Sequence, residues 1–193
     1  DERVEDWGFS YTFYNMQLKK YIYYNIDKDE RKDFHKKAAK ILERLHELEK
    51  RENIDELVYH LVLSGQKEKA VEYLILHAKK MEYILNAEAI SLWEKAYELL
   101  DEGPSKKKRE ILISLGNLLI AEGENDNALN VFNQVLNDAN ILNSNKYIAI
   151  AKNAIGEIYI RRSQHEKAEK FILEAQKSAK NIGYLDGQLN SIY

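Results

Sequence analysis

The chain has 193 residues, of which 45% are hydrophobic and 32% charged, and its net charge is -3 at pH 7. This composition predicts one folded domain or a short repeat array. The small negative charge gives no electrostatic reason to expect nucleic acid or an anionic membrane as a partner. The chain has no cysteine, which excludes disulfides, zinc fingers and thiol catalysis and favours a cytoplasmic location.

Two further features bear on where the protein works. No apolar run approaches the roughly 18 residues that a membrane span needs, so we expect no contact with membranes. Asp1 is not a start methionine and no signal peptide follows it. We therefore expect the chain to be a piece of a longer protein or a processed product.

The first half of the chain predicts one short strand and several helices. Trp7, Phe9, Tyr11 and Phe13 alternate with smaller or polar residues, as in a strand, but a lone strand needs a partner. The helix that begins near Asp29 has an expected core stripe of Phe34, Ala38, Ile41, Leu42 and Leu45. The helices expected in this half cover residues 15–26, 29–49, 53–64, 67–84 and 86–101.

The second half of the chain predicts four helices with a clear spacing of apolar residues. The single proline is Pro104, so long stretches contain no backbone breaker. Gly123, Asn143 and Gly183 stand where helices are expected to stop. The four expected helices cover residues 104–122, 125–141, 145–162 and 165–181. Their expected core stripes are Ile111, Leu112, Leu115, Leu118 and Leu119; Ala128, Val131, Phe132, Val135 and Leu136; Ile148, Ala151, Ile155, Ile158 and Tyr159; and Ala168, Phe171, Ile172 and Ala175.

One pattern returns along the chain. The stretches GQKEKAVEYL (65–74), GENDNALNVF (123–132) and SQHEKAEKFI (163–172) each open with a small residue and reach Ala at the sixth position. Gly116 and Gly156 lie 40 residues apart, as do Ala128 and Ala168. Small residues on both helices of an antiparallel pair let the two backbones approach closely. A fixed period of this length predicts a solenoid of stacked helix pairs.

These residues resemble the tetratricopeptide repeat (TPR). The resemblance implies an all-α fold, a right-handed α-solenoid of antiparallel helix pairs, with a short N-terminal strand as the only other element. The sequence departs from the family pattern at Lys152, in lacking the terminal proline, and in its period of about 40 rather than 34. The matching positions are Leu112, Leu115, Gly116, Leu119, Gly123, Ala128 and Phe132 in one repeat, and Ile155, Gly156, Tyr159, Ser163, Ala168, Ile172 and Ala175 in the next.

A second resemblance covers roughly the first 90 residues. The run from Phe9 to Phe13, the helix ending at Ile26, and the positions Phe34, His35 and His60 are similar to the junction between a winged helix and a helical-repeat sensor in STAND-type signalling ATPases. The two resemblances divide the chain into three parts. Residues 1–50 would end a winged-helix-like element, 51–103 would form degenerate repeats, and 104–193 would form TPR-like repeats, the last one cut short.

The search for catalytic chemistry favours a protein without enzymatic activity, cofactor or metal. The chain contains no P-loop, no dinucleotide fingerprint and no nucleophile elbow. The five histidines show no metal-ligand spacing, so we expect each to have a structural role. The run from Lys106 to Arg109 is expected to be a solvated helix start, with a nucleic-acid patch or an address signal as the alternatives.

The expected binding surface is the concave face, which the first helix of each repeat lines in the TPR family. The resemblance places seven residues there: Ile113, Asn117, Ile120, Asn153, Glu157, Ile160 and Arg161. Ile113 stands where family members that grip a terminal carboxylate carry lysine, so such a grip is not expected. The expected partner is a protein, an extended peptide or a neighbouring domain of the same chain.

Three functions remain open from the sequence. The first is a regulatory module of a larger signalling ATPase that senses a protein or ligand by shifting between docked and released arrangements. The second is a free-standing adaptor that binds partners in its groove. The third, an enzyme fragment, ranks last because no catalytic constellation is present.

Overall fold

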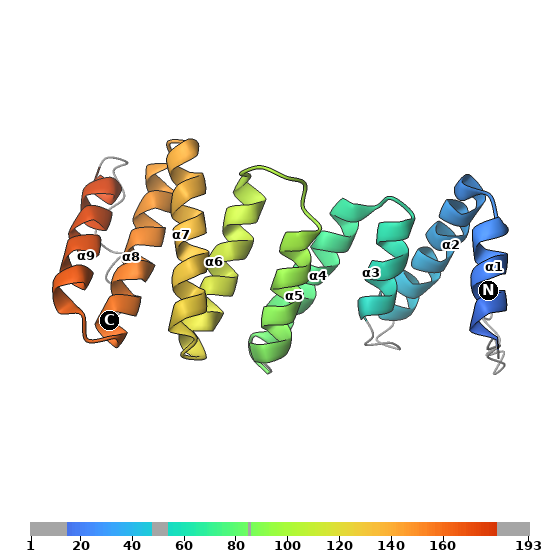
Figure 1. Cartoon of the computed structure of the whole chain (residues 1–193), viewed down its shortest axis with the longest axis horizontal. Helices are drawn as coiled ribbons and strands as arrows, with labels where there is room; N and C mark the ends of the chain where they lie inside the picture. The colour runs from blue at the N-terminus through green and yellow to red at the C-terminus, as the bar shows by residue number, and fades with distance from the viewer. Residues whose placement is uncertain (1–14, 48–53, 85, 181–193) are drawn as a thin grey trace.

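The computed structural model describes residues 15–47, 54–84 and 86–180, and every regular element in these ranges is an α-helix (Figure 1). The expected strand from Trp7 to Phe13 and the expected helix stop at Gly183 lie outside them. Within the described ranges, no helix has the length and apolar character that crossing a bilayer requires. The helices are α1 (Met16–Asn25), α2 (Lys28–Glu47), α3 (Ile54–Leu63), α4 (Lys67–Met81), α5 (Asn86–Glu98), α6 (Lys106–Ala121), α7 (Asn125–Ile141), α8 (Asn145–Arg161) and α9 (His165–Lys180).

The nine described helices match the nine predicted ones, and the all-α fold is confirmed. The bounds of α7 are those predicted, and the other ends differ by three residues or fewer. Capping residues explain several starts. Asn15 caps α1 because its side-chain oxygen accepts from the backbone N–H of Gln17 and Leu18, and Ser105 caps α6 in the same way at Lys108.

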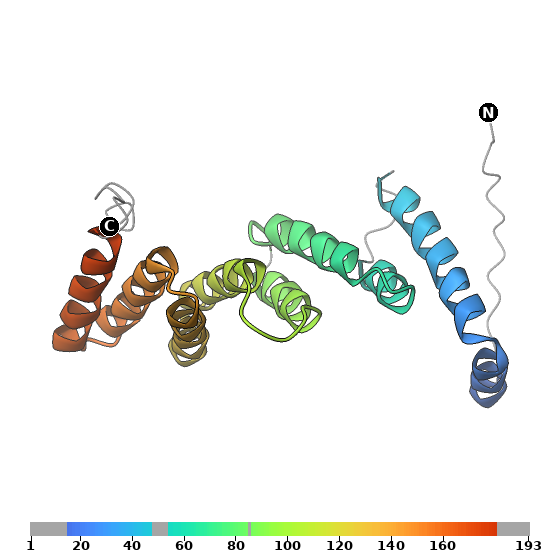
Figure 2. The same cartoon turned by 90° about the horizontal axis from the view of Figure 1, so that it is seen from above.

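The helices form an elongated array of antiparallel neighbours. Each helix from α2 to α9 packs on the next one along the chain, and α6 also contacts α8. In Figures 1 and 2, α3, α5 and α7 form one row, and α2, α4, α6 and α8 form a second row beside it. The even-numbered helices are thus the first members of successive pairs, and α6 and α8 of this row contact each other.

The small residue that opens each repeated stretch ends a helix with a left-handed turn. At Gly123 (φ 80°), the N–H of Glu124 bonds to the carbonyl of Leu119 at 2.8 Å. This bond reaches back five positions, as in a Schellman motif, and needs a positive φ at the residue before Glu124. Equivalent turns occur at Gly65, Asn143 and Ser163. The turns at Gly123, Asn143 and Ser163 therefore follow one another every 20 residues.

The glycine of each C-terminal pair is needed because a large side chain occupies the space beside it. A Cβ on Gly116 would lie 2.6 Å from Cε2 of Phe132, and one on Gly156 would lie 2.7 Å from Cγ1 of Ile172. Phe132 and Ile172 follow the repeated alanines by four residues. The predicted close approach therefore occurs, and the large residue on the second helix packs on the glycine of its own pair.

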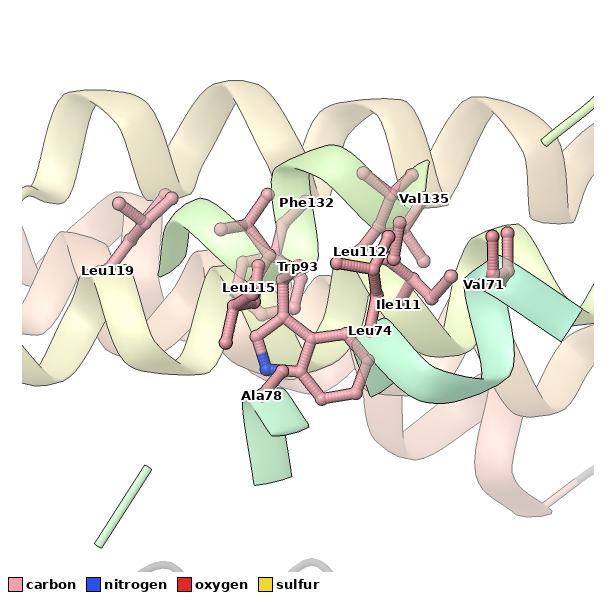
Figure 3. Packing of buried hydrophobic residues seen from close by; sticks show 14 of the residues in the cluster. Val71, Leu74, Ala78, Trp93, Ile111, Leu112, Leu115, Leu119, Phe132 and Val135 are labelled. Carbon is pink, nitrogen blue, oxygen red and sulfur yellow. The ribbon is translucent and has the colours of Figure 1, made fainter. Parts of the chain in front are cut away.

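The apolar core runs through the array and is continuous from α2 to α8. Figure 3 shows the Trp93 indole of α5 among side chains of α4 and α6, with Phe132 and Val135 of α7 beyond them. Trp93 is 2% exposed, and its ring N–H donates to Glu82 at 2.8 Å, so its polar atom is satisfied. The predicted stripes of the four C-terminal helices lie buried or half-buried in this structure.

The predicted core stripe of α2 is partly wrong. Phe34 is 49% exposed and Ile41 is 62% exposed. The buried face of α2 instead carries His35, Ala39 and Leu42, which follow one another at helical spacing. The predicted stripe begins one residue too early, at Phe34 in place of His35, and Leu42 belongs to both the predicted and the observed stripe.

His35 is buried because a chain of polar contacts satisfies both of its ring nitrogens. Its Nε2 lies 2.8 Å from the hydroxyl of Tyr23 on α1, and its Nδ1 lies 2.8 Å from Nδ1 of His60 on α3. Both contacts are satisfied when Tyr23 donates to His35, His35 donates to His60 and both rings are neutral. Burial lowers the pKa of both histidines, and the charge of His60 lowers the pKa of His35 further.

A second histidine pair joins α2 to α4. Nε2 of His77 lies 3.3 Å from Nε2 of His46, and His77 is buried. The fifth histidine, His165, is exposed at the start of α9. Four of the five histidines therefore connect helices, in pairs whose partners are 25 and 31 residues apart in sequence.

Candidate functional site

The even-numbered row of helices contains an open pocket of about 550 Å³. It lies where α4, α6 and α8 come together, with one residue of α5 beneath. The pocket therefore spans three successive helix pairs. Its lining residues are Ile75, Lys79, Trp93, Lys107, Glu110, Ile111, Ile113, Ser114, Lys146, Tyr147 and Ile150.

Helical periodicity explains why these residues meet. Lys107, Glu110, Ile111 and Ser114 recur every three or four residues and so lie on one face of α6. Lys146 and Ile150 have the same relation on α8, as do Ile75 and Lys79 on α4. Each helix contributes about one and a half turns to the pocket, and the stacking of the pairs brings these turns together.

The floor of the pocket is apolar and fixed by the core. Trp93 is 2% exposed and Ile111 is 1% exposed, and both belong to the central cluster. Ile75 and Ile113 are half-buried and pack against the same cluster. A side chain entering the pocket would therefore meet rigid apolar surface, which favours a large apolar group.

The rim of the pocket is cationic. It carries Lys79, Lys107 and Lys146 and a single carboxylate, Glu110. Lys107 Nζ lies 3.8 Å from a carboxylate oxygen of Glu72, at the outer limit of an ion pair. Within the described ranges, no carboxylate lies at ion-pair distance from Lys79 or Lys146. The local excess of positive charge contrasts with the net charge of -3 of the whole chain.

Tyr147 forms one wall and is held from both sides. Its hydroxyl donates to Glu110 at 3.2 Å, and the Arg109 guanidinium lies 4.6 Å from its ring centroid. Burial and the neighbouring Glu110 carboxylate raise the pKa of Tyr147, so its hydroxyl keeps its proton at neutral pH. This bond holds the exposed Glu110 carboxylate beside Tyr147, and Lys106 Nζ lies 3.7 Å from the same carboxylate.

The prediction of a solvated helix start at Lys106 to Arg109 is wrong for two of the four residues. Lys108 is 9% exposed and Arg109 is 6% exposed. Lys108 lies over the Tyr97 ring and Arg109 over the Tyr147 ring, so both cations are covered by aromatic residues of neighbouring helices. Nε and Nη1 of Arg109 have no hydrogen-bond partner, so its charge is only partly compensated.

The structure places the three predicted residues of α6 differently from one another. Ile113 lines the pocket. Asn117 is exposed one turn beyond Ser114 on the same face. Ile120 is 5% exposed and belongs to the apolar core, because it faces the neighbouring helices.

The four predicted residues of α8 continue the face that begins at Lys146 and Ile150. Asn153 and Glu157 are half-buried, and Ile160 and Arg161 are exposed. Arg161 donates to Glu157 at 2.9 Å, so these two side chains compensate each other. These residues therefore lie on the same helix faces beyond the pocket, toward the C-terminal ends of α6 and α8.

The sequence analysis did not single out Lys79, Lys146 and Tyr147. Lys79 and Lys146 have no unusual local sequence, and Tyr147 resembles a core residue. One feature of the sequence could have pointed to the two lysines. Each of them is next in sequence to a residue of its helix's buried stripe and so lies at the edge of that stripe. That feature occurs many times in the chain, and only the stacking of three helix pairs selects these lysines.

The lining residues define which chemical groups the pocket presents. Its lining includes no histidine, and its hydroxyl groups are those of Ser114 and Tyr147. Within residues 15–47, 54–84 and 86–180, no group of three or more potential ligands is arranged to hold a metal ion. What the site provides is an apolar floor, a cationic rim and hydrogen-bonding groups along two helices.

Comparisons with known proteins give fold resemblances only. No protein-family model and no curated protein matches the sequence. Solved structures with a similar arrangement include MamA, which is 17% identical over 90% of this chain and 100% of its own, with a TM-score of 0.49. They also include the nearly identical TPR-like repeats of a candidate kinesin light chain from Podosopora anserina, at 15% identity over 86% and 93% of the two chains and a TM-score of 0.49. What the groove binds is therefore inferred from its own residues.

Proposed function

We propose that this chain is a non-catalytic protein-interaction module that binds an extended peptide segment of a partner protein. The segment lies along the face of α4, α6 and α8. The observation that carries this proposal is the pocket itself, because one apolar floor with charged and hydroxyl groups around it spans three helix pairs. A largely preformed groove of this kind loses little conformational entropy on binding, so most of the entropy cost comes from ordering the peptide.

The peptide is longer than the pocket alone would hold. Asn117 on α6 and Asn153 on α8 follow the pocket on the same faces and carry amide groups, which bond equally well to backbone N–H and C=O. Glu157, Ile160 and Arg161 extend the surface by a further two turns. We propose that these five residues contact the chain of the ligand beyond the pocket, while Ile113 contacts the side chain inside it.

The experiment is a selection of random peptides of about twelve residues, displayed on phage, against the full 193-residue chain. Selected peptides are then titrated against Ser114→Trp and Ile150→Trp, which fill the pocket, and against Asn130→Trp, an exposed position on α7. We expect the two pocket variants to weaken binding about tenfold or more and Asn130→Trp to have no effect. Equal binding by all three variants, with unchanged circular dichroism, would refute the groove as the binding site.

A finer proposal concerns the larger protein. The resemblance of the first 90 residues to a STAND sensor junction favours a regulatory arm of a signalling ATPase, with the division at residues 50 and 103 as its boundaries. The alternative is a free-standing adaptor. Sequencing about 400 codons upstream of Asp1 separates the two. A P-loop followed by a winged-helix pattern supports the regulatory arm, and an adjacent start codon supports the adaptor.

A further inference from the structure

We infer that the pocket between α4, α6 and α8 selects an acidic peptide segment, one large apolar side chain flanked by aspartate or glutamate side chains. This inference rests on the proposed function and names the chemistry of its ligand. It differs from a grip on a terminal carboxylate, because the cations here surround an apolar floor from three separate helices.

The charges of the pocket are the first reason. Lys79, Lys107 and Lys146 come from three different helices, and together with Glu110 they leave an excess of two positive charges at the rim. Glu110 is already engaged by the Tyr147 hydroxyl at 3.2 Å. Lys79 and Lys146 are exposed and have no carboxylate at ion-pair distance within the described ranges. These ammonium groups are therefore available to the carboxylates of a ligand.

The covered arginine beside the pocket adds to the same field. Arg109 is 6% exposed, stacks on the Tyr147 wall and has two guanidinium nitrogens without a partner. A charge surrounded by protein is screened less than one in water, so it contributes to the potential at the rim. The position of Arg109 behind the wall raises the attraction for an anion without requiring direct contact.

The apolar floor decides what else the ligand must carry. The half-buried apolar residues of the lining are Ile75, Ile113 and Ile150, above the buried Trp93 and Ile111, and this surface suits a large apolar side chain. A segment that places Leu, Ile or an aromatic residue on this floor brings its neighbouring side chains to the rim. Because the rim is cationic, Asp or Glu at those neighbouring positions is favoured and Lys or Arg is disfavoured.

The same surface does not suit a nucleic acid. Three lysines are few for a polyanion, and Glu110 and Glu157 on the same two helices would repel phosphates. The aromatic residues of the pocket are also not open for stacking, since Trp93 is 2% exposed and Tyr147 is 7% exposed. The observations therefore favour a peptide over a single-stranded oligonucleotide.

Binding can be followed with the protein's own tryptophan. The chain has two tryptophans, and a Trp7→Phe background leaves Trp93, which lines the pocket, as the only one. The probe is a peptide of about nine residues with a central Leu and three Asp or Glu residues on each side, blocked at both termini so that only side chains are charged. Three control peptides are compared with it. One has Asn and Gln in place of the acidic residues, one has Lys in their place, and the third is the neutral peptide with a free terminal carboxylate.

We expect the acidic peptide to change the Trp93 emission and to bind about tenfold or more tightly than the neutral one. The affinity should fall as salt is raised from about 50 to about 500 mM, because the Debye length shortens. The combined variant Lys79→Gln, Lys107→Gln, Lys146→Gln should lose this preference. The combined variant Lys36→Gln, Lys170→Gln, Lys177→Gln removes the same net charge from exposed lysines outside the pocket and should keep it.

Each other outcome overturns a defined part. Equal affinity for the acidic, neutral and basic peptides, with binding still lost in Ser114→Trp, refutes the acidic preference and leaves the proposed function intact. If both triple-lysine variants lose the preference for the acidic peptide equally, the preference comes from the net charge of the protein and not from the lysines of the pocket rim. If binding requires the free terminal carboxylate, the ligand is a peptide C-terminus and not an acidic segment. If an oligothymidine of about twelve nucleotides binds more tightly than the acidic peptide, the ligand is a nucleic acid. Failure of every peptide, including those from the display selection, refutes the proposed function itself.

Discussion

The two ends of the array are held together by different chemistry. Between α6 and α9, each pair buries an apolar stripe, and Phe132 and Ile172 fill the space beside Gly116 and Gly156. Between α1 and α3, a chain of polar rings is added to the apolar contacts of α2 with α3. His35 joins Tyr23 to His60, and α1 has no buried residue at all.

This difference shows that one arrangement of helices can be specified in two ways. Gly and Ala at fixed spacing determine how closely the C-terminal helices approach, and any larger side chain is excluded. At the N-terminal end, hydrogen bonds between ring nitrogens and a hydroxyl fix the same kind of packing. Such bonds depend on protonation, whereas apolar packing does not. The two ends should therefore respond differently to mutation and to pH.

The largest expected effect is loss of the C-terminal core. Phe132→Ala removes a ring that is 0% exposed and leaves a cavity between α6 and α7. We expect the free energy of unfolding to fall by about 3–5 kcal/mol. Urea denaturation followed by circular dichroism measures it. A loss below about 1 kcal/mol would mean that the pair does not pack on this residue.

The next effect tests the fit of glycine against phenylalanine. Gly116→Ala places a Cβ about 2.6 Å from the Phe132 ring, so overpacking should cost about 1–3 kcal/mol despite the better helix propensity of alanine. Asn117→Ala, one position along on the exposed side, controls for propensity. Adding Phe132→Leu to Gly116→Ala should recover part of the loss, and a purely additive double variant would contradict this packing.

The pH response should appear at the N-terminal end. Burial lowers the pKa of His35 and His60 in the folded state below that of the unfolded chain, about 6.5. The unfolded state therefore binds more protons below that pH. The stability from this pair is complete above about pH 6.5 and is lost as pH falls through the folded-state pKa values. Arg31 lowers the pKa of His35, and Glu56 opposes the shift at His60.

Amide exchange at about pH 7.5 and about pH 5.5, corrected for intrinsic rates, measures this response. We expect protection to fall in α1–α3 and to change little in α6–α9. Replacing both His35 and His60 with Asn should remove the difference, whereas His165→Asn, at an exposed position, should preserve it. Equal loss of protection at both ends would exclude the histidine pair as the cause.

The smallest effect is expected where the sequence placed a core residue wrongly. Phe34 is 49% exposed, so Phe34→Ala should change the free energy of unfolding by about 0.5 kcal/mol or less. The same denaturation experiment as for Phe132→Ala gives the comparison directly. A cost near that of Phe132→Ala would mean that Phe34 packs against another part of the protein.

The sequence predicted the positions of the helices accurately, but it predicted less accurately which residues of a helix are buried against other helices. The nine helices, the turns at Gly123 and Asn143 and the close approach at Gly116 all follow from local rules about capping, positive φ and small residues. The stripe of α2 was shifted by one residue, because the burial of His35 depends on partners 12 and 25 residues away. No local rule contains those partners.

The candidate site divides in the same way. The sequence placed Ile113, Asn117, Asn153 and Glu157 on the faces of the first helices, and they lie there, because helical spacing alone assigns a face. The sequence by itself therefore determined the helices and their pairing. Only the tertiary structure brought Lys79, Lys107 and Lys146 from three helices to one rim, since that depends on how successive pairs stack. It also decided that Arg109 and His35 are covered, because burial is a property of the assembled neighbours and not of the residue.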